Sequence, residues 1–190
     1  MIGGAAGAGA HAAVRRTVRA ARGAAGLPRR HAALALLWLG AALHAGAADA
    51  PLLRNPFNDP FIRATDGRAC PAPLGPAYSD TQRLQESHSR IERGTSCWLA
   101  GECSEPNAYR FDASIARDVV AALRADTALA GSSLWVTSQR RFVYLEGCVA
   151  DAAQAARAEA VAKAVANVQL VTPALALPGE APPYAVAPPP

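Results

Sequence analysis

The sequence predicts an α+β fold, in which helices pack on one face of a three-stranded mixed sheet that follows a disulfide-containing extension. Three observations lead to this class. Residues 112–129 repeat apolar side chains at helical spacing, residues 133–149 contain two alternating runs typical of paired strands, and residues 151–177 hold an alanine-rich helix before a last strand. The predicted order is therefore helix, strand, strand, helix, strand within residues 111–177.

The first helix, residues 112–129, has the clearest pattern. Ile115, Val119 and Leu123 fall on one face, as expected of an amphipathic helix that covers a sheet. Asp112 is a residue type that often caps a helix N-terminus, so we expect it to do so here. The glycine at position 131 ends the pattern before the strands begin.

The two strands are close enough to form a hairpin, with its turn predicted at residues 138–140. The second strand reads V-x-L-x-G-x-V and places four residues on its buried face, namely Val143, Leu145, Gly147 and Val149. Because Gly147 has no side chain to pack there, we predict that it lets the strand bend or lets a helix pack closely.

The second helix begins after Asp151, which suits an N-cap. Its alanines permit close approach to a sheet, and Val161 and Val165 supply most of its apolar contact. The last strand, "VQLVTPAL", contains Pro173, which cannot donate a ladder hydrogen bond. A proline at this position predicts an edge strand or the end of the pairing.

This segment resembles a BON domain, the small module named from bacterial osmotic-stress and nodulation proteins. The V-x-L-x-G-x-V strand and the alanine-rich helix carry the resemblance, together with "NVQLV", where Val168 and Val171 match two valines of a Gly-Val-x-x-Val-like segment. Asn167 replaces the family's usual glycine, and asparagine tolerates left-handed backbone better than most residues. The resemblance covers about a third of the chain, in a single copy.

The resemblance implies a non-enzymatic role in the bacterial cell envelope. Some such domains bind anionic phospholipid or help to maintain the envelope under osmotic stress, and others dock on protein partners in envelope or secretion complexes. Aromatic and arginine side chains around the hairpin turn suit a lipid headgroup interface. The candidate lipid- or partner-binding residues are Trp135, Arg140, Arg141, Phe142 and Tyr144. Alternatively, the three aromatic side chains cover the second face of the sheet or pack beneath the N-terminal extension.

Residues 1–47 are predicted to be a signal peptide. Arg29 and Arg30 precede the apolar run "HAALALLWLGAAL", and small residues follow, which is the order of a secretory signal; an uncleaved anchor is the alternative. This leader predicts a location in the periplasm or cell envelope. Six of the 19 basic residues and none of the 15 acidic ones lie in the leader, so the remainder carries a net charge of −2. That balance gives no support for nucleic-acid binding.

Export decides how the cysteines are interpreted. All four, Cys70, Cys97, Cys103 and Cys148, follow the leader, and an even number in an exported chain favours disulfides. Four cysteines allow three connectivities. We favour Cys97–Cys103, because "SCWLAGEC" is a short loop that can close on itself, and this choice leaves Cys70 with Cys148. Metal and redox sites are weaker alternatives, because no C-x2-C spacing occurs.

Three segments flank the predicted domain. Residues 48–77 are rich in proline and are predicted to be irregular or extended. Residues 78–110 contain a short helix, which ends at Gly94, and then the cysteine loop. Residues 178–190 are rich in proline and are predicted to form a disordered or extended tail.

The short helix in the extension begins at Ser79 or Asp80 and places Leu84, His88 and Ile91 on one face. His88 is the only histidine after the leader, so any Ser-His-Asp or Cys-His arrangement would have to use it. Its sequence context gives no such indication. We find no nucleotide-binding, zinc-binding or calcium-binding motif, so we expect neither an enzyme nor a cofactor or metal site.

Overall fold

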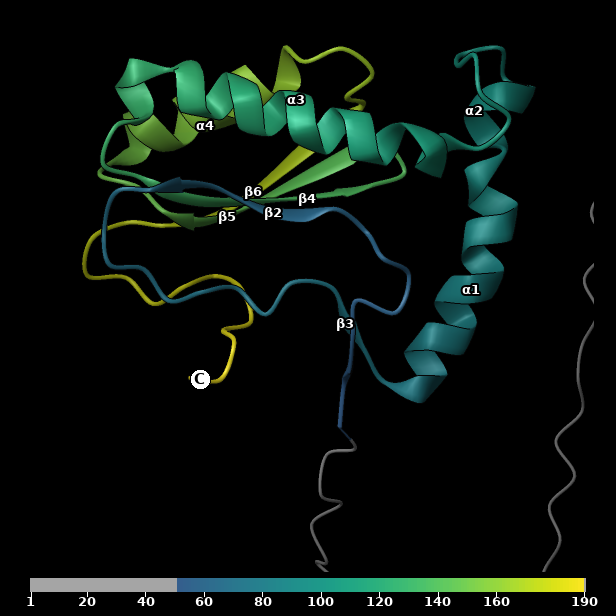
Figure 1. Cartoon of the computed structure of the whole chain (residues 1–190), viewed down its shortest axis with the longest axis horizontal. Helices are drawn as coiled ribbons and strands as arrows, with labels where there is room; N and C mark the ends of the chain where they lie inside the picture. Colours follow the sequence, from purple (N-terminus) through teal and green to yellow (C-terminus); the bar gives the residue numbers. More distant parts are fainter. Residues whose placement is uncertain (1–50, 190) are drawn as a thin grey trace, which may run out of the picture. The chain divides into compact units, whose positions relative to one another are not determined.

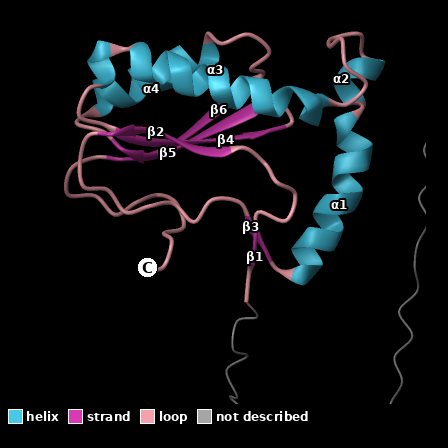
Figure 2. Ribbon diagram, viewed as in Figure 1, coloured by secondary structure: helices cyan, strands magenta, loops and turns pink. Residues whose placement is uncertain are grey.

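The computed structural model describes residues 51–189, and the predicted leader lies outside this range. Two helices, α3 and α4, cover one face of a four-stranded sheet, and the extension and the C-terminal tail run along its other face (Figure 1). Figure 2 shows the same layers by secondary structure. The strands and helices, with two 3-10 turns η1 and η2, are β1 (Leu53–Arg54), β2 (Phe61–Asp66), β3 (Ala77–Tyr78), α1 (Asp80–Gly94), α2 (Ser96–Leu99), η1 (Ala108–Phe111), α3 (Asp112–Ala125), η2 (Thr127–Leu129), β4 (Ser133–Gln139), β5 (Phe142–Cys148), α4 (Ala152–Lys163) and β6 (Leu170–Ala176).

The mixed α+β class is confirmed, but the sheet has one strand more than predicted. Its strand order is β2-β4-β5-β6, with β5 and β6 parallel and the other pairs antiparallel. The extra strand, β2, lies within residues 48–77, which we predicted to be irregular or extended; the pairing of this segment with the sheet was not predicted. It pairs with β4 through a bulge between Arg63 and Thr65. This edge strand has prolines on both sides, and its pairing partner lies far along the chain. Local sequence patterns therefore do not identify it.

The core lies between the sheet and the two covering helices, as the periodicities predicted. Leu123 of α3 and Leu134, Val143 and Leu145 of the hairpin are all completely buried. The buried core cluster lies between residues 64 and 171, and both disulfides also lie after the leader. The segment from residue 47 onward is one compact unit that contains its own core.

Two backbone predictions are confirmed, and the one for Gly147 needs a correction. Gly147 has a φ of +141°, and a Cβ there would lie 2.0 Å from the backbone oxygen of Ser133, so the element that approaches closely is strand β4 and not a helix. Asn167 has a φ of +66°, the left-handed conformation expected where the family has glycine. Pro173 lies in β6, which is an edge strand, and therefore removes no hydrogen bond from the sheet interior.

Helix α1 begins at a capping box, in which Ser79 accepts a hydrogen bond from the Gln82 N–H and the Gln82 side chain accepts one from the Ser79 N–H. The face that carries its apolar residues points to solvent: Leu84 is 60% exposed and Ile91 is 74% exposed. The apolar residues Leu84 and Ile91 share one face of this helix, as predicted. The opposite, polar face contacts the rest of the chain.

A buried ion pair attaches the polar face of α1 to the sheet. Arg90 donates two hydrogen bonds to the Asp59 carboxylate, at 2.8 and 2.6 Å, and its guanidinium lies between the rings of Phe57 and Tyr109, at 4.1 and 4.5 Å. Gln139, at the end of β4, donates to the same carboxylate at 2.5 Å. Burial alone would lower the pKa of Arg90, but the hydrogen bonds and negative charge of Asp59 outweigh it and raise that pKa above its ordinary value.

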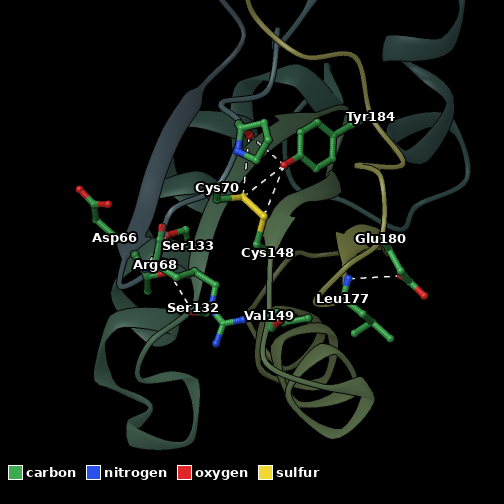
Figure 3. Close-up of a disulfide and its surroundings, with 12 residues drawn as sticks. Asp66, Arg68, Cys70, Ser132, Ser133, Cys148, Val149, Leu177, Glu180 and Tyr184 are labelled. Carbon is green, nitrogen blue, oxygen red and sulfur yellow. Dashed lines mark hydrogen bonds between the residues drawn. A yellow bond between two sulfur atoms is a disulfide. The ribbon is translucent and has the colours of Figure 1, made fainter.

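The structure contains the two disulfides that the loop argument favoured, Cys70–Cys148 and Cys97–Cys103. The first joins the extension to the end of β5 (Figure 3). Tyr184 of the tail lies against this disulfide, with its hydroxyl 3.3 Å from the Cys70 sulfur. The described part of residues 178–190, which we predicted to be disordered or extended, thus contacts the extension in the structure.

The tail is held in place by backbone pairing as well as by Tyr184. Its hydroxyl donates to the Pro71 carbonyl at 2.9 Å, and residues 185 and 187 exchange backbone hydrogen bonds with residues 74 and 72. Tail and extension thus run side by side beneath the sheet (Figure 1). In the part of the chain that is described, no helix is long and apolar enough to cross a membrane.

Candidate binding surface at the hairpin turn

The β4–β5 turn consists of only two residues, Arg140 and Arg141, and both have positive φ, +55° and +66°. The predicted turn began too early, because β4 continues through Gln139. Positive φ at both central residues is the type I′ conformation, for which Asn-Gly is strongly preferred. Left-handed backbone costs an ordinary residue about 1–2 kcal/mol. Two arginines in this turn are therefore conformationally unfavourable and need support from elsewhere.

That support comes from Asp112, the first residue of α3. Its carboxylate is 3% exposed and accepts hydrogen bonds from the backbone N–H groups of Arg140 and Arg141, at 2.7 and 2.8 Å, and from the Ser138 hydroxyl at 2.9 Å. Burial raises the pKa of Asp112, and these three hydrogen bonds offset part of the rise. The predicted N-cap role is wrong: Phe111 occupies that position without a side-chain cap, because the Asp112 carboxylate faces the turn instead.

The side chains of the two turn residues rest on aromatic rings. The Arg140 guanidinium lies 4.5 Å from the centre of the Phe142 ring, and that of Arg141 lies 5.6 Å from the centre of the Phe111 ring. The Arg141 Nε also donates to the Asn167 carbonyl at 2.9 Å. Among residues 51–189, neither guanidinium forms an ion pair. Both positive charges remain available to an external anion.

A small polar cleft of about 180 Å³ opens beside Arg140. The extension supplies one wall and the hairpin supplies the other, so the cleft exists only because α1 docks on the domain. The residues that line it are Tyr78, Glu86, Arg93 and Tyr109 from the extension, and Gln139, Arg140, Phe142 and Tyr144 from the hairpin.

The charges around this cleft are partly compensated. Glu86 accepts from Arg90 at 3.2 Å and from Arg93 at 3.3 Å, while Asp59 compensates Arg90 as described above. The two acids thus balance two of the three nearby arginines. One positive charge, that of Arg140, is left without a carboxylate partner.

Within the described residues, the hydroxyls of Tyr109 and Tyr144 have no hydrogen-bond partner. Neither hydroxyl oxygen is fully buried. Burial raises the pKa of both tyrosines, although the positive charge of nearby arginines, Arg90 for Tyr109 and Arg140 for Tyr144, opposes the rise. Both hydroxyls therefore stay protonated near neutral pH and can donate to a ligand.

Four of the five predicted binding residues lie at or next to the turn. Arg140, Phe142 and Tyr144 line the cleft, whereas Arg141 lies outside it, over the Phe111 ring. The fifth prediction is wrong as a binding surface: Trp135 is only 7% exposed and is covered by the guanidinium of Arg63, at 4.6 Å, so it covers the second sheet face as in the alternative interpretation.

The sequence interpretation missed three residues that build this surface, Asp112 as its support and Arg93 and Tyr109 as its far wall. No local pattern identifies them, because Asp112 binds a turn 28 residues later and the cleft brings Arg93 and Tyr109 together with residues of the hairpin far along the chain. In residues 51–189, no group of three or more His, Cys, Asp or Glu residues could hold a metal ion.

Comparison with known families agrees with this geometry. The family model of the BON domain matches residues 111–179. This part of the chain is a single BON domain. A search of curated proteins found no match. The matched residues include α3, the hairpin, α4 and β6, whereas β2 and the α1 wall of the cleft lie outside the BON domain.

Proposed function

We propose that this chain is a non-enzymatic binding module of the cell envelope, which contacts anionic phospholipid through the turn between β4 and β5. One observation carries the proposal. Two arginines occupy the central positions of a turn that disfavours them, and a buried carboxylate holds that turn in place. Backbone strain that persists because the surroundings impose it is typical of functional sites.

The surroundings of the turn support an anionic, lipid-like ligand. The two guanidinium groups have no carboxylate partner among the described residues, and each lies over an aromatic ring. Guanidinium groups bind phosphate oxygens in a bidentate manner, and aromatic rings beside them suit the headgroup region. The remainder of the chain after the leader has a net charge of −2, so binding would depend on these local charges and would fall with salt.

Vesicle co-sedimentation tests this function on the oxidised fragment from residue 48 to 190, since the six arginines of the leader would bind anionic vesicles by themselves. We expect binding to anionic but not to neutral vesicles, and weaker binding at moderate salt. The double change Arg140→Gln with Arg141→Gln should abolish binding. The matched control, Arg54→Gln with Arg117→Gln, removes two exposed arginines elsewhere and should retain it. Equal loss in both variants, or no binding at all, would refute the proposal.

Docking on a protein partner is the second candidate function, and a separate observation favours it. Helices α1 and α2 expose four large apolar residues, with exposed fractions from 48% to 79%, namely Leu84, Ile91, Trp98 and Leu99. An apolar protein surface would bury them. Chemical cross-linking in envelope extracts checks this candidate: a specific adduct lost in Leu84→Gln with Ile91→Gln supports it, and an unchanged pattern argues against it.

A further inference from the structure

The cleft beside Arg140 has the features of a ligand site. Binding to a membrane surface does not by itself require such a cleft. It lies between the extension and the BON domain, and each side contributes both a positive charge and a tyrosine hydroxyl. Arg93 and Tyr109 face it from the extension, and Arg140 and Tyr144 face it from the hairpin. A ligand there would contact two segments that only the folded chain brings together.

The charges of the residues around the cleft limit its ligand to a single negative charge. Glu86 is shared by Arg90 and Arg93, and Asp59 is paired with Arg90, so only the charge of Arg140 is uncompensated. A dianion would have to displace Glu86 from its arginines. A singly charged group needs no rearrangement.

The hydrogen-bond donors and the size of the cleft narrow the chemical class of the ligand further. Arg140 and the hydroxyls of Tyr109 and Tyr144 offer donors from both walls, and among residues 51–189 these donors have no acceptor. A phosphodiester shares one negative charge between two non-bridging oxygens, which accept several hydrogen bonds in different directions. The volume of about 180 Å³ exceeds that of a lone carboxylate and leaves room for the ester substituents on either side.

We propose that the cleft between α1 and the hairpin is a subsite for a singly charged phosphodiester, bound by the guanidinium of Arg140 and by the hydroxyls of Tyr109 and Tyr144. The inference rests on the proposed function, because the Arg140 charge is common to both. It adds that a headgroup enters a defined site and does not only meet a charged surface. Phe142 closes the wall beneath the Arg140 guanidinium and keeps it at the cleft.

The anchor of α1 positions the extension wall of the subsite. Arg90 fixes α1 to Asp59 and at the same time lies against the Tyr109 ring. Tyr109 and Arg93 therefore reach the cleft only while this buried pair is intact. The BON domain alone supplies the Arg140 and Tyr144 wall and lacks the other half.

Titration with dimethyl phosphate, a soluble phosphodiester monoanion, tests the subsite on the fragment from residue 48 to 190. We expect weak binding, detected by chemical-shift changes of the Tyr109 and Tyr144 rings. Each of Tyr109→Phe and Tyr144→Phe removes one hydroxyl without changing the ring, and each should weaken binding about tenfold, the effect of one hydrogen bond to a charged group. Tyr184→Phe is the matched control, because its hydroxyl contacts the distant disulfide, and it should leave the affinity unchanged.

Two further arms separate the sources of the ligand and the two proposals. Inorganic phosphate should bind more weakly than dimethyl phosphate; tighter binding of inorganic phosphate would overturn the phosphodiester assignment. Vesicle binding should fall in Tyr109→Phe with Tyr144→Phe. If vesicle binding persists there but is lost in Arg140→Gln with Arg141→Gln, the subsite is refuted while the membrane function stands. If the parent fragment binds dimethyl phosphate but no vesicles, the membrane function fails and a soluble phosphodiester is the ligand.

Discussion

Removal of the Asp112 carboxylate should destabilise the hairpin turn more than any other single polar substitution near it. This carboxylate is buried and accepts three hydrogen bonds of 2.7 to 2.9 Å, two of them from the strained turn. A hydrogen bond to a charged group contributes about 1.5–3 kcal/mol. Three such bonds, less the cost of burying the charge, lead us to expect a loss of about 3 kcal/mol in the free energy of unfolding for Asp112→Ala.

A graded series makes this expectation specific. Asp112→Asn keeps an oxygen for Ser138 and Arg141 but places an N–H₂ donor opposite the Arg140 N–H, so we expect an intermediate loss. Ser138→Ala removes only one of the three bonds and should cost about 1 kcal/mol. Urea unfolding measures the free energies, and hydrogen exchange measures protection of the Arg140 and Arg141 amides. Unchanged stability and unchanged amide protection in Asp112→Ala would refute the proposed support of the turn.

Three other perturbations have defined outcomes. Gly147→Ala should destabilise the fold by more than about 3 kcal/mol in urea unfolding, because its Cβ would overlap the β4 backbone; a loss below about 1 kcal/mol would contradict this. Burial raises the pKa of Glu146 above its unfolded value, so its charged form opposes folding. Glu146→Gln should therefore raise the Tm at pH 7, and the gain should shrink as the pH falls toward 4, where the carboxyl group is protonated in the parent too; an equal gain at both pH values would argue against it. Cys70→Ser with Cys148→Ser opens a loop of 78 residues and should cost about 4 kcal/mol, roughly twice the loss for the six-residue loop closed by Cys97–Cys103; the reverse order would be inconsistent with the loop-entropy argument.

Periodicity predicted those parts of the fold whose side chains face a common core. Val143 and Leu145 alternate with half-buried residues along β5, and the burial of the structure repeats that alternation. Local backbone chemistry was equally informative: Asn167 and Gly147 both occupy conformations that few other residues accept. For Asn167 the physical cause is its own left-handed backbone, whereas Gly147 is required by the approach of the Ser133 backbone on the paired strand.

Long-range contacts explain what the sequence did not predict. Helix α1 has one apolar face, and periodicity cannot tell that this face is exposed while Arg90 on the other side forms a buried pair with Asp59, 31 residues earlier. Asp112 has the character of an N-cap, yet its carboxylate binds a turn 28 residues later. The two-arginine turn carries no Asn-Gly signal, since its left-handed backbone is imposed by that tertiary contact.

The central claim is that the turn holds arginines for binding and not for stability, and one variant tests it most directly. Arg140→Asn with Arg141→Gly installs the sequence that a type I′ turn prefers. Relief of strain, about 1 kcal/mol per residue, should roughly offset the lost contacts with the Phe142 and Phe111 rings, worth about 0.5–1 kcal/mol each. Measured on one preparation, the variant should unfold within about 1 kcal/mol of the parent and no longer bind anionic vesicles. Retained vesicle binding by a fully folded variant would contradict the account.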